Sequence, residues 1–290
     1  MKILVSTDTS CLISKDTFKN LDISVFPLNV LIDEVEYLDG VSIGQEELSV
    51  AMKEDKNIKT STPPLGVVIE YFENLFAKGY DQIIHFTISS KFSSMYSLFK
   101  TVSSNFFDDK IVVVDSLGAS TAMLSQVLYA YDELNKGTSV EDIYNTIEEN
   151  KTKCKVYVVP ENLNSLRKGG RVSGIAALFG NTLGLKPVIA LNNGELLKEG
   201  MTRKVRSTLI ELFDKFIENN NFEDFDFTII NFDGKEAVLS TLENHITEKI
   251  GQNKVMQGVL PINVCAHCGP GTVGLAITRK INGKSIKQFL

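Results

Sequence analysis

Short apolar runs that end in polar residues recur through the first half of the chain. This pattern is typical of buried β-strands that each lead into a loop, and it covers residues 2–6, 81–89 and 110–116. Helical patterns lie between and after these runs, with proline in a first turn, serine at a start or glycine at an end, over residues 63–79, 93–106 and 118–137. Three strand–loop–helix units predict a parallel sheet covered by helices.

Polar side chains gather at the predicted carboxyl ends of these strands. Open parallel sheets bind their ligands at that edge. The polar residues there are Asp8, Thr9, Ser10, Ser89, Ser90, Ser93, Asp115 and Ser116. We therefore expect the ligand site to lie along this edge.

The pattern changes near residues 151–155, beyond which predicted strands outnumber helices. Strands are predicted over residues 155–160, 186–200, 225–233, 254–267 and 272–280, with an Asn-Asn-Gly hairpin turn in the second. Two long helices are predicted over residues 207–220 and 235–251. We expect an α/β protein of two domains, with the ligand between them. Residues 1–153 would form a three-layer α/β/α domain with a parallel sheet, and residues 154–290 an α+β domain with a mixed or antiparallel sheet.

Composition and charge exclude some classes of protein. The chain has 290 residues, of which 43% are hydrophobic, enough to fill a large core. A formal net charge of -6 and the lack of a long Lys or Arg run argue against a nucleic-acid ligand. The N-terminus turns polar well before the roughly 7–15 apolar residues of a secretory signal or the about 20 of a membrane span. We therefore expect a cytoplasmic protein with its cysteines reduced.

The segment Cys-Ala-His-Cys-Gly-Pro-Gly at residues 265–271 has four interpretations. Cys265, His267 and Cys268 are zinc-ligand types, but no second paired group stands at a telling spacing, and on the predicted strand Cys268 would point away from the other two. His267 could also act as the base for a Ser or Cys nucleophile, although the chain has no GxSxG elbow. It could be a buried histidine in a turn. Lastly, Gly-Pro-Gly could let the backbone approach a ligand and fix the imidazole against it.

Two hydroxyl-rich segments precede predicted helices. Thr60, Ser61 and Thr62 stand directly before two prolines, and Ser93 and Ser94 stand in the turn before the next helix. Hydroxyls and free amides at a helix start suit an anion, although an ordinary N-cap needs only one of them. Neither segment has the glycines and lysine that hold a nucleotide.

A third group of candidates is basic. Arg171 lies in the Lys-Gly-Gly-Arg turn at residues 168–171, and Arg203 and Arg206 follow the predicted hairpin. These arginines could bind phosphate, dock a partner or belong to solvated loops.

Seven segments together resemble the DegV family, the bacterial fatty-acid-binding proteins that act as the lipid-carrying subunit of fatty acid kinase. The segments are VSTDTS, KTSTPP, ISSKFSSMY, VVVDSLGAS, LRKGGRVS, LKPVIALNNGELL and AHCGPGTVGLA, which begin at residues 5, 59, 88, 112, 166, 185 and 266. They occur in the family's order over nearly the whole chain. Seven such segments in order are far more specific than any one of them.

The resemblance implies a non-catalytic subunit that holds a long-chain fatty acid between two domains. Its carboxylate would be bound by hydroxyls and a histidine, here Ser61, Thr62, Ser93, Ser94 and His267. Arg171 and Arg203 fall on positions associated with the kinase partner and phosphoryl transfer. The resemblance implies no cofactor or metal on this chain, since ATP and Mg would be bound by the kinase. The acyl phosphate would enter phospholipid metabolism, with only transient membrane contact for lipid exchange.

The chain departs from the family pattern beside the proposed contacts. Thr62 stands where a glutamine is usual, Ser94 and Met95 replace Gly-Thr, and Cys268 replaces a threonine. These changes bear on the carboxylate geometry and on acyl-chain preference. Two alternatives stay open: a stand-alone hydrolase of esters or thioesters that uses Ser93 or Cys268 with His267, and a binding module for another apolar acid.

Overall fold

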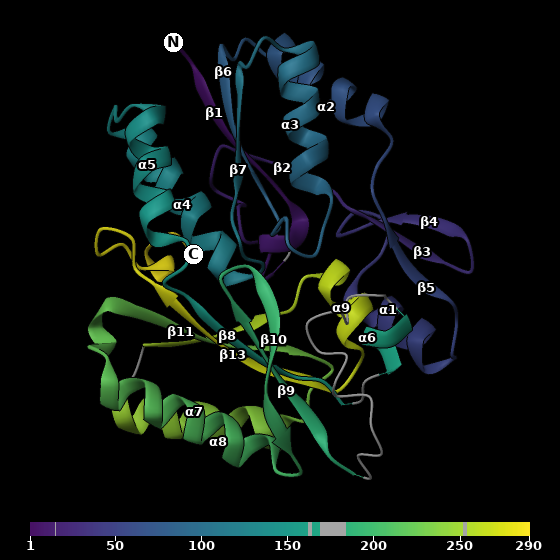
Figure 1. The fold of residues 1–290 in the computed structure, drawn as a ribbon, viewed down its shortest axis with the longest axis vertical. Coiled ribbons are helices and arrows are strands. Elements are labelled where there is room, and N and C mark those ends of the chain that lie inside the picture. Colours follow the sequence, from purple (N-terminus) through teal and green to yellow (C-terminus); the bar gives the residue numbers. More distant parts are fainter. Residues whose placement is uncertain (15, 162–163, 169–183, 252–253) are drawn as a thin grey trace.

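The computed structural model has two main sheets, one above the other, with helices on both faces of the upper sheet and below the lower one, and a small third sheet beside them (Figure 1). It describes residues 1–290 apart from 15, 162–163, 169–183 and 252–253. Among the described helices, none is long and apolar enough to cross a membrane.

The first sheet is parallel throughout and has the strand order β2-β1-β6-β7. Its strands are β1 (Ile3–Asp8), β2 (Ile23–Phe26), β6 (Gln82–Thr87) and β7 (Ile111–Asp115). Alternate side chains face opposite sides, so Leu4 packs toward α2 (Leu65–Ala77) and α3 (Met95–Phe106), whereas Val5 packs toward α4 (Thr121–Asn135) and α5 (Val140–Asn150). The predicted three-layer arrangement is confirmed.

The second sheet is mixed and has the order β10-β9-β8-β13-β11-β12. Its strands are β8 (Lys155–Val159), β9 (Lys186–Asn192), β10 (Glu195–Thr202), β11 (Phe225–Phe232), β12 (Val255–Val259) and β13 (Thr272–Arg279). The β11–β12 pair is parallel and the other pairs are antiparallel. Helices α7 (Val205–Asn219) and α8 (Glu236–Ile250) cover one face. This confirms the predicted mixed sheet and its hairpin.

A third sheet was not foreseen from the sequence. It is antiparallel, with the order β4-β3-β5, and consists of β3 (Asn29–Ile32), β4 (Val35–Leu38) and β5 (Ile58–Ser61). Helix α1 (Gln45–Lys53) lies in the connection between β4 and β5. Three short 3-10 turns, at Thr9–Cys11, Phe222–Asp224 and Ile286–Gln288, and helices α6 (Asn164–Lys168) and α9 (Ile262–Cys268) complete the described elements.

The prediction of a strand over residues 254–267 was wrong in its second half. Strand β12 ends at Val259, and Pro261 then caps helix α9 (Ile262–Cys268). Proline suits a helix start because its missing N–H would have no partner inside the helix, and Gly269, with a φ of 80°, ends it. Cys265 and His267 therefore do not alternate along a strand. Instead Asn263 and His267, four residues apart, lie on one face of α9.

Apolar packing continues across the predicted domain junction. One buried cluster joins Val30 and Leu48 from the small sheet region to Val156 and Ile230 of the mixed sheet and Ile262 of α9. Helix α9 also contacts α1 and β5. The elements that carry the candidate site are thus packed directly against one another.

Candidate functional site

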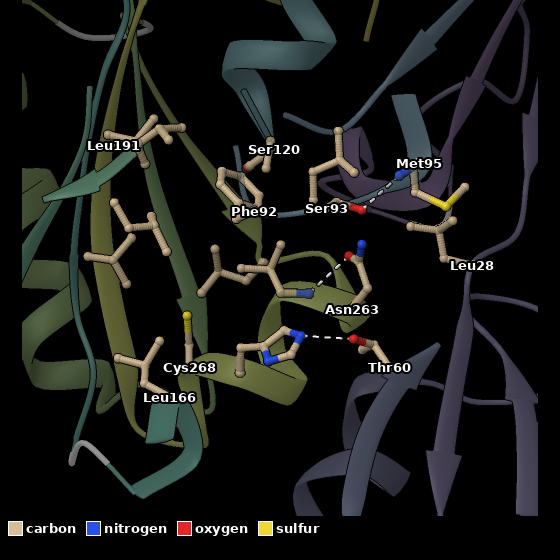
Figure 2. A pocket seen from close by; sticks show the side chains of 18 of the residues that line it. Leu28, Thr60, Phe92, Ser93, Met95, Ser120, Leu166, Leu191, Asn263 and Cys268 are labelled. Carbon is tan, nitrogen blue, oxygen red and sulfur yellow. Dashed lines mark hydrogen bonds between the residues drawn. The ribbon is translucent and has the colours of Figure 1, made fainter. Parts of the chain in front are cut away.

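A pocket lies between the loops of the parallel sheet, the small sheet, helix α9 and the inner face of the mixed sheet (Figure 2). The mixed sheet supplies an apolar wall, made of Val156, Val158, Ile189, Leu191, Leu196 and Ile230. The polar lining residues come from other elements and are Asn29, Thr60, Ser61, Thr62, Ser93, Ser120, Asn263, His267 and Cys268. The pocket therefore has an apolar side and a side rich in neutral hydrogen-bonding groups.

The imidazole of His267 is held by a hydroxyl from the small sheet. Its Nε2 and the Oγ1 of Thr60 are 2.9 Å apart, and Figure 2 shows this hydrogen bond at the edge of the pocket. His267 is half-buried, and Thr60 lies in strand β5. This bond fixes the ring of a residue on α9 against a segment more than 200 residues earlier.

The other predicted hydroxyls lie around the same pocket. Ser61, Thr62 and Ser93 line it, and Ser94 is joined to Thr62 by a 2.7 Å hydrogen bond between their hydroxyls. Ser93 Oγ accepts a hydrogen bond from the backbone N–H of Met95, 3.3 Å away, at the start of α3. Ser61, Thr62 and Ser94 are exposed, whereas Ser93 is half-buried. The structure thus gathers these residues with His267, while their role as carboxylate ligands stays a prediction.

A buried polar network sets the position of α9. Asp39 Oδ2 accepts hydrogen bonds from Thr9 Oγ1 at 2.9 Å and from the backbone N–H of Asn263 at 3.3 Å. The Asn263 amide in turn donates to Ser10 Oγ at 2.7 Å. Burial raises the pKa of Asp39 to about 7, against the lowering effect of these hydrogen bonds. The start of α9 is therefore tied to the loop after β1 by a carboxyl group that keeps its proton to a higher pH than an exposed aspartate does.

Most of the polar residues at the strand ends hold the loops together instead of lining the pocket. Asp8 accepts hydrogen bonds from the N–H groups of Ser10 and Ile88, and burial raises its pKa to about 6. Ser116 Oγ donates to Thr87 O, and Ser89 Oγ donates to the carbonyl of Gly194 in the β9–β10 turn. Among the strand-end residues that the sequence pointed to, Ser93 alone appears in the described lining of the pocket.

The two arginines are less informative. Arg171 lies outside the described residues. Arg203 is exposed just after β10 and is not among the described residues that line the pocket. Their association with a partner therefore rests on the sequence resemblance.

The cysteines are poor candidates for an activated nucleophile. Burial raises the pKa of Cys268 to about 12 and that of Cys265 well above its usual range, so the reactive thiolate is scarce at neutral pH. Within the described part of the chain, no group of three or more His, Cys, Asp or Glu side chains is placed to hold a metal ion.

The sequence did not identify Thr60, Asn263 and Ser120 as residues that line the pocket. Thr60 stood in the predicted hydroxyl cluster, but only strand β5 shows that its side chain reaches His267. Asn263 gave no signal in the sequence beyond its polarity, and Ser120 appeared only as the last residue of the segment VVVDSLGAS, without a role of its own. Both owe their position to the packing of distant segments.

The chain matches known proteins along most of its length. A family model described as "Uncharacterised protein, DegV family" matches residues 2–280. A DegV domain-containing protein of Staphylococcus aureus strain N315 is 28% identical over 282 residues, which are 96% of this chain and 99% of that protein.

Solved structures also match the chain over most of its length. DegV of Bacillus subtilis, described as a fatty acid binding protein, is 25% identical with a TM-score of 0.83, covering 96% of this chain and 99% of that chain. A structure described as fatty acid binding of a DegV family protein from Thermus thermophilus is 24% identical, with a TM-score of 0.86, and covers 96% of this chain and 100% of that chain. The architecture described above is therefore one that experimental structures already contain.

Proposed function

Because the chain belongs to the DegV family, we propose that it binds a long-chain fatty acid in the pocket between its sheets. The observation that carries this proposal is the division of the pocket into an apolar wall and a hydroxyl-rich side. The acyl tail would lie along Val156, Ile189 and Leu191 of the wall, and the carboxylate would face the hydroxyls and His267.

The tail supplies most of the affinity in this proposal. Each buried methylene contributes roughly 0.8 kcal/mol, so a chain with about 14 of them gains on the order of 11 kcal/mol before the costs of association. The wall residues are aliphatic and offer the close apolar contacts that this gain requires.

The carboxylate needs donors, because an ionised group that leaves water without them is strongly destabilised. Ser93 carries a hydroxyl, and the Thr60–His267 pair offers one further donor, which is whichever of the Thr60 hydroxyl and the imidazole N–H is not used in the bond between them. Hydrogen bonds to a charged group are stronger than those between neutral groups. Neutral donors also leave the carboxylate free to react, which suits a carrier that presents a substrate.

The finer part of the proposal is that this carrier presents its carboxylate to a separate ATP-dependent kinase, which phosphorylates it to an acyl phosphate. ATP and Mg would be held by that kinase, and Arg171 and Arg203 would serve the partner or the phosphoryl group. Such a protein would work in the cytoplasm and touch a membrane only to exchange lipid. The support for this part is the family resemblance together with the neutral donor set.

The first test is to identify the natural ligand. The purified protein should release long-chain fatty acids on organic extraction, in roughly equimolar amount, when the extract is analysed by mass spectrometry. An extract without fatty acids, together with no uptake of added oleate or stearate, would refute the proposal.

The second test concerns the head group. We expect His267→Ala and Ser93→Ala each to weaken fatty-acid binding by roughly 10-fold or more, the effect of losing a hydrogen bond to a charged group. His245→Ala and Ser97→Ala are matched controls, since neither residue is among the described lining residues. With the kinase of the same organism, His267→Ala should also lower acyl phosphate formation. Affinities and rates equal to those of the controls would contradict the assigned roles.

A further inference from the structure

Ser120 has a backbone conformation that residues other than glycine rarely adopt. It is the residue before α4, with a φ of 53° and a ψ of -137°. Its N–H donates to Ser10 O at 2.6 Å, and its carbonyl accepts from Leu124 N at 2.9 Å. The surrounding loops thus hold Ser120 in a strained conformation, a feature that clusters at functional sites.

The hydroxyl of this residue has nothing to bind in the described protein. Ser120 is 2% exposed, and its Oγ has no hydrogen-bond partner among the described residues. The neighbouring hydroxyl of Thr121, by contrast, accepts a hydrogen bond from Thr278 at 3.0 Å. Because an unpaired buried hydroxyl is costly, each one calls for an explanation.

Ser120 lines the pocket, which supplies that explanation. Figure 2 shows it beside Phe92, at the opposite end of the view from Thr60, with Ser93 and Asn263 between. Ser10 connects it to α9, since Ser10 O accepts from Ser120 N and Ser10 Oγ accepts from the Asn263 amide. Ser120 also stands at the N-terminus of the 15-residue helix α4, whose free N–H groups favour an electron-rich atom.

We propose that the Ser120 hydroxyl donates a hydrogen bond to an oxygen atom of the bound ligand, making this end of the pocket an oxygen-binding position in addition to the Thr60–His267 pair. The inference rests on the proposed fatty-acid function and deepens it. The ligand oxygen has two possible sources: the carboxylate itself, or a hydroxyl or keto group on the acyl chain. Either one would satisfy the buried hydroxyl and complement the positive end of α4.

The test measures the affinities of wild type, Ser120→Ala and Ser120→Gly for stearate and for 12-hydroxystearate. Glycine removes both the hydroxyl and the backbone strain, whereas alanine removes the hydroxyl alone. Ser125→Ala, a buried serine elsewhere on α4, is the control. If the carboxylate is the acceptor, both Ser120 variants should bind stearate roughly 10-fold or more weakly. If a chain oxygen is the acceptor, both should lose roughly 2- to 10-fold for 12-hydroxystearate alone.

Other outcomes overturn the proposal. Wild-type affinity for both ligands in Ser120→Gly would mean that the hydroxyl has no ligand role and that Ser120 only shapes the turn. If wild type binds stearate and both Ser120 variants have the same affinities as Ser125→Ala, this inference fails and the fatty-acid function stands. A wild-type protein that binds neither ligand refutes the fatty-acid function and this inference together.

Discussion

Replacing Asp39 by asparagine tests the buried network that positions α9. Both hydrogen bonds that Asp39 receives, from Thr9 and from the N–H of Asn263, end on Oδ2. The carbonyl oxygen of asparagine can accept both, and its amide group replaces the second carboxyl oxygen. Asp39→Asn therefore resembles the protonated form of Asp39 in shape and hydrogen bonding.

The expected effect follows from the pKa of this group. Burial raises the pKa of Asp39 from 3.8 to about 7, so between these values the folded protein keeps a proton that the unfolded chain has lost. The folded state then binds more protons, and its stability falls as the pH rises toward 7. A shift of roughly 3 units corresponds to about 4 kcal/mol in all, of which about 3 kcal/mol falls between pH 5 and pH 8.

The assay is urea denaturation of wild type and Asp39→Asn from pH 5 to pH 8. The variant lacks this titration, so its free energy of unfolding should rise relative to wild type by about 3 kcal/mol over that range. Asp16→Asn, at a residue whose side chain is 60% exposed, is the surface control. A difference between variant and wild type that is independent of pH would show that Asp39 is ionised in the folded protein and would refute the reasoning.

Two other predictions concern the join between the sheets and the pocket thiol. Gly194→Ala should destabilise the protein by roughly 1–3 kcal/mol, because the φ of Gly194 is 82° and a Cβ there would lie 2.8 Å from Leu117 Cδ2 and 2.9 Å from Ser89 Oγ. Gly200→Ala, where a Cβ would meet no atom within 4 Å, is its control in urea denaturation, and equal stabilities would contradict the prediction. Cys268, whose pKa is raised to about 12, should react with iodoacetamide at pH 8 roughly a thousandfold more slowly than a free thiol. Peptide mapping that finds rapid alkylation of Cys268 would instead support an activated nucleophile.

The elements that the sequence predicted well are those whose pattern matches their burial. Strands β1, β6 and β7 each contain a short apolar run and have both faces covered, and the β9–β10 hairpin has an Asn-Gly turn. Their layers and sheet types follow from these local signals.

The errors arose where local signal is weak or ambiguous. Strands β4 (VEYL) and β5 (IKTS) have four residues each and are largely exposed, so they show no apolar run. The segment from Val259 to His267 is apolar and rich in β-branched residues, which suits a strand as well as a buried helix, and only Pro261 marked the change. Ser120 could not be identified, because its strained backbone depends on contacts with Ser10 and α4 that only the folded chain makes.

The β9–β10 hairpin contributes both to the pocket and to the contact between the mixed sheet and the parallel-sheet loops. Its strands place Ile189, Leu191 and Leu196 in the apolar wall, and its turn receives the Ser89 hydroxyl from the loop after β6 at 2.8 Å. A bulky or bent ligand beside the wall would therefore press on the same hairpin that connects the mixed sheet to the loops of the parallel sheet. On the proposed fatty-acid function, ligands of different shape should therefore change the melting temperature of the protein by different amounts.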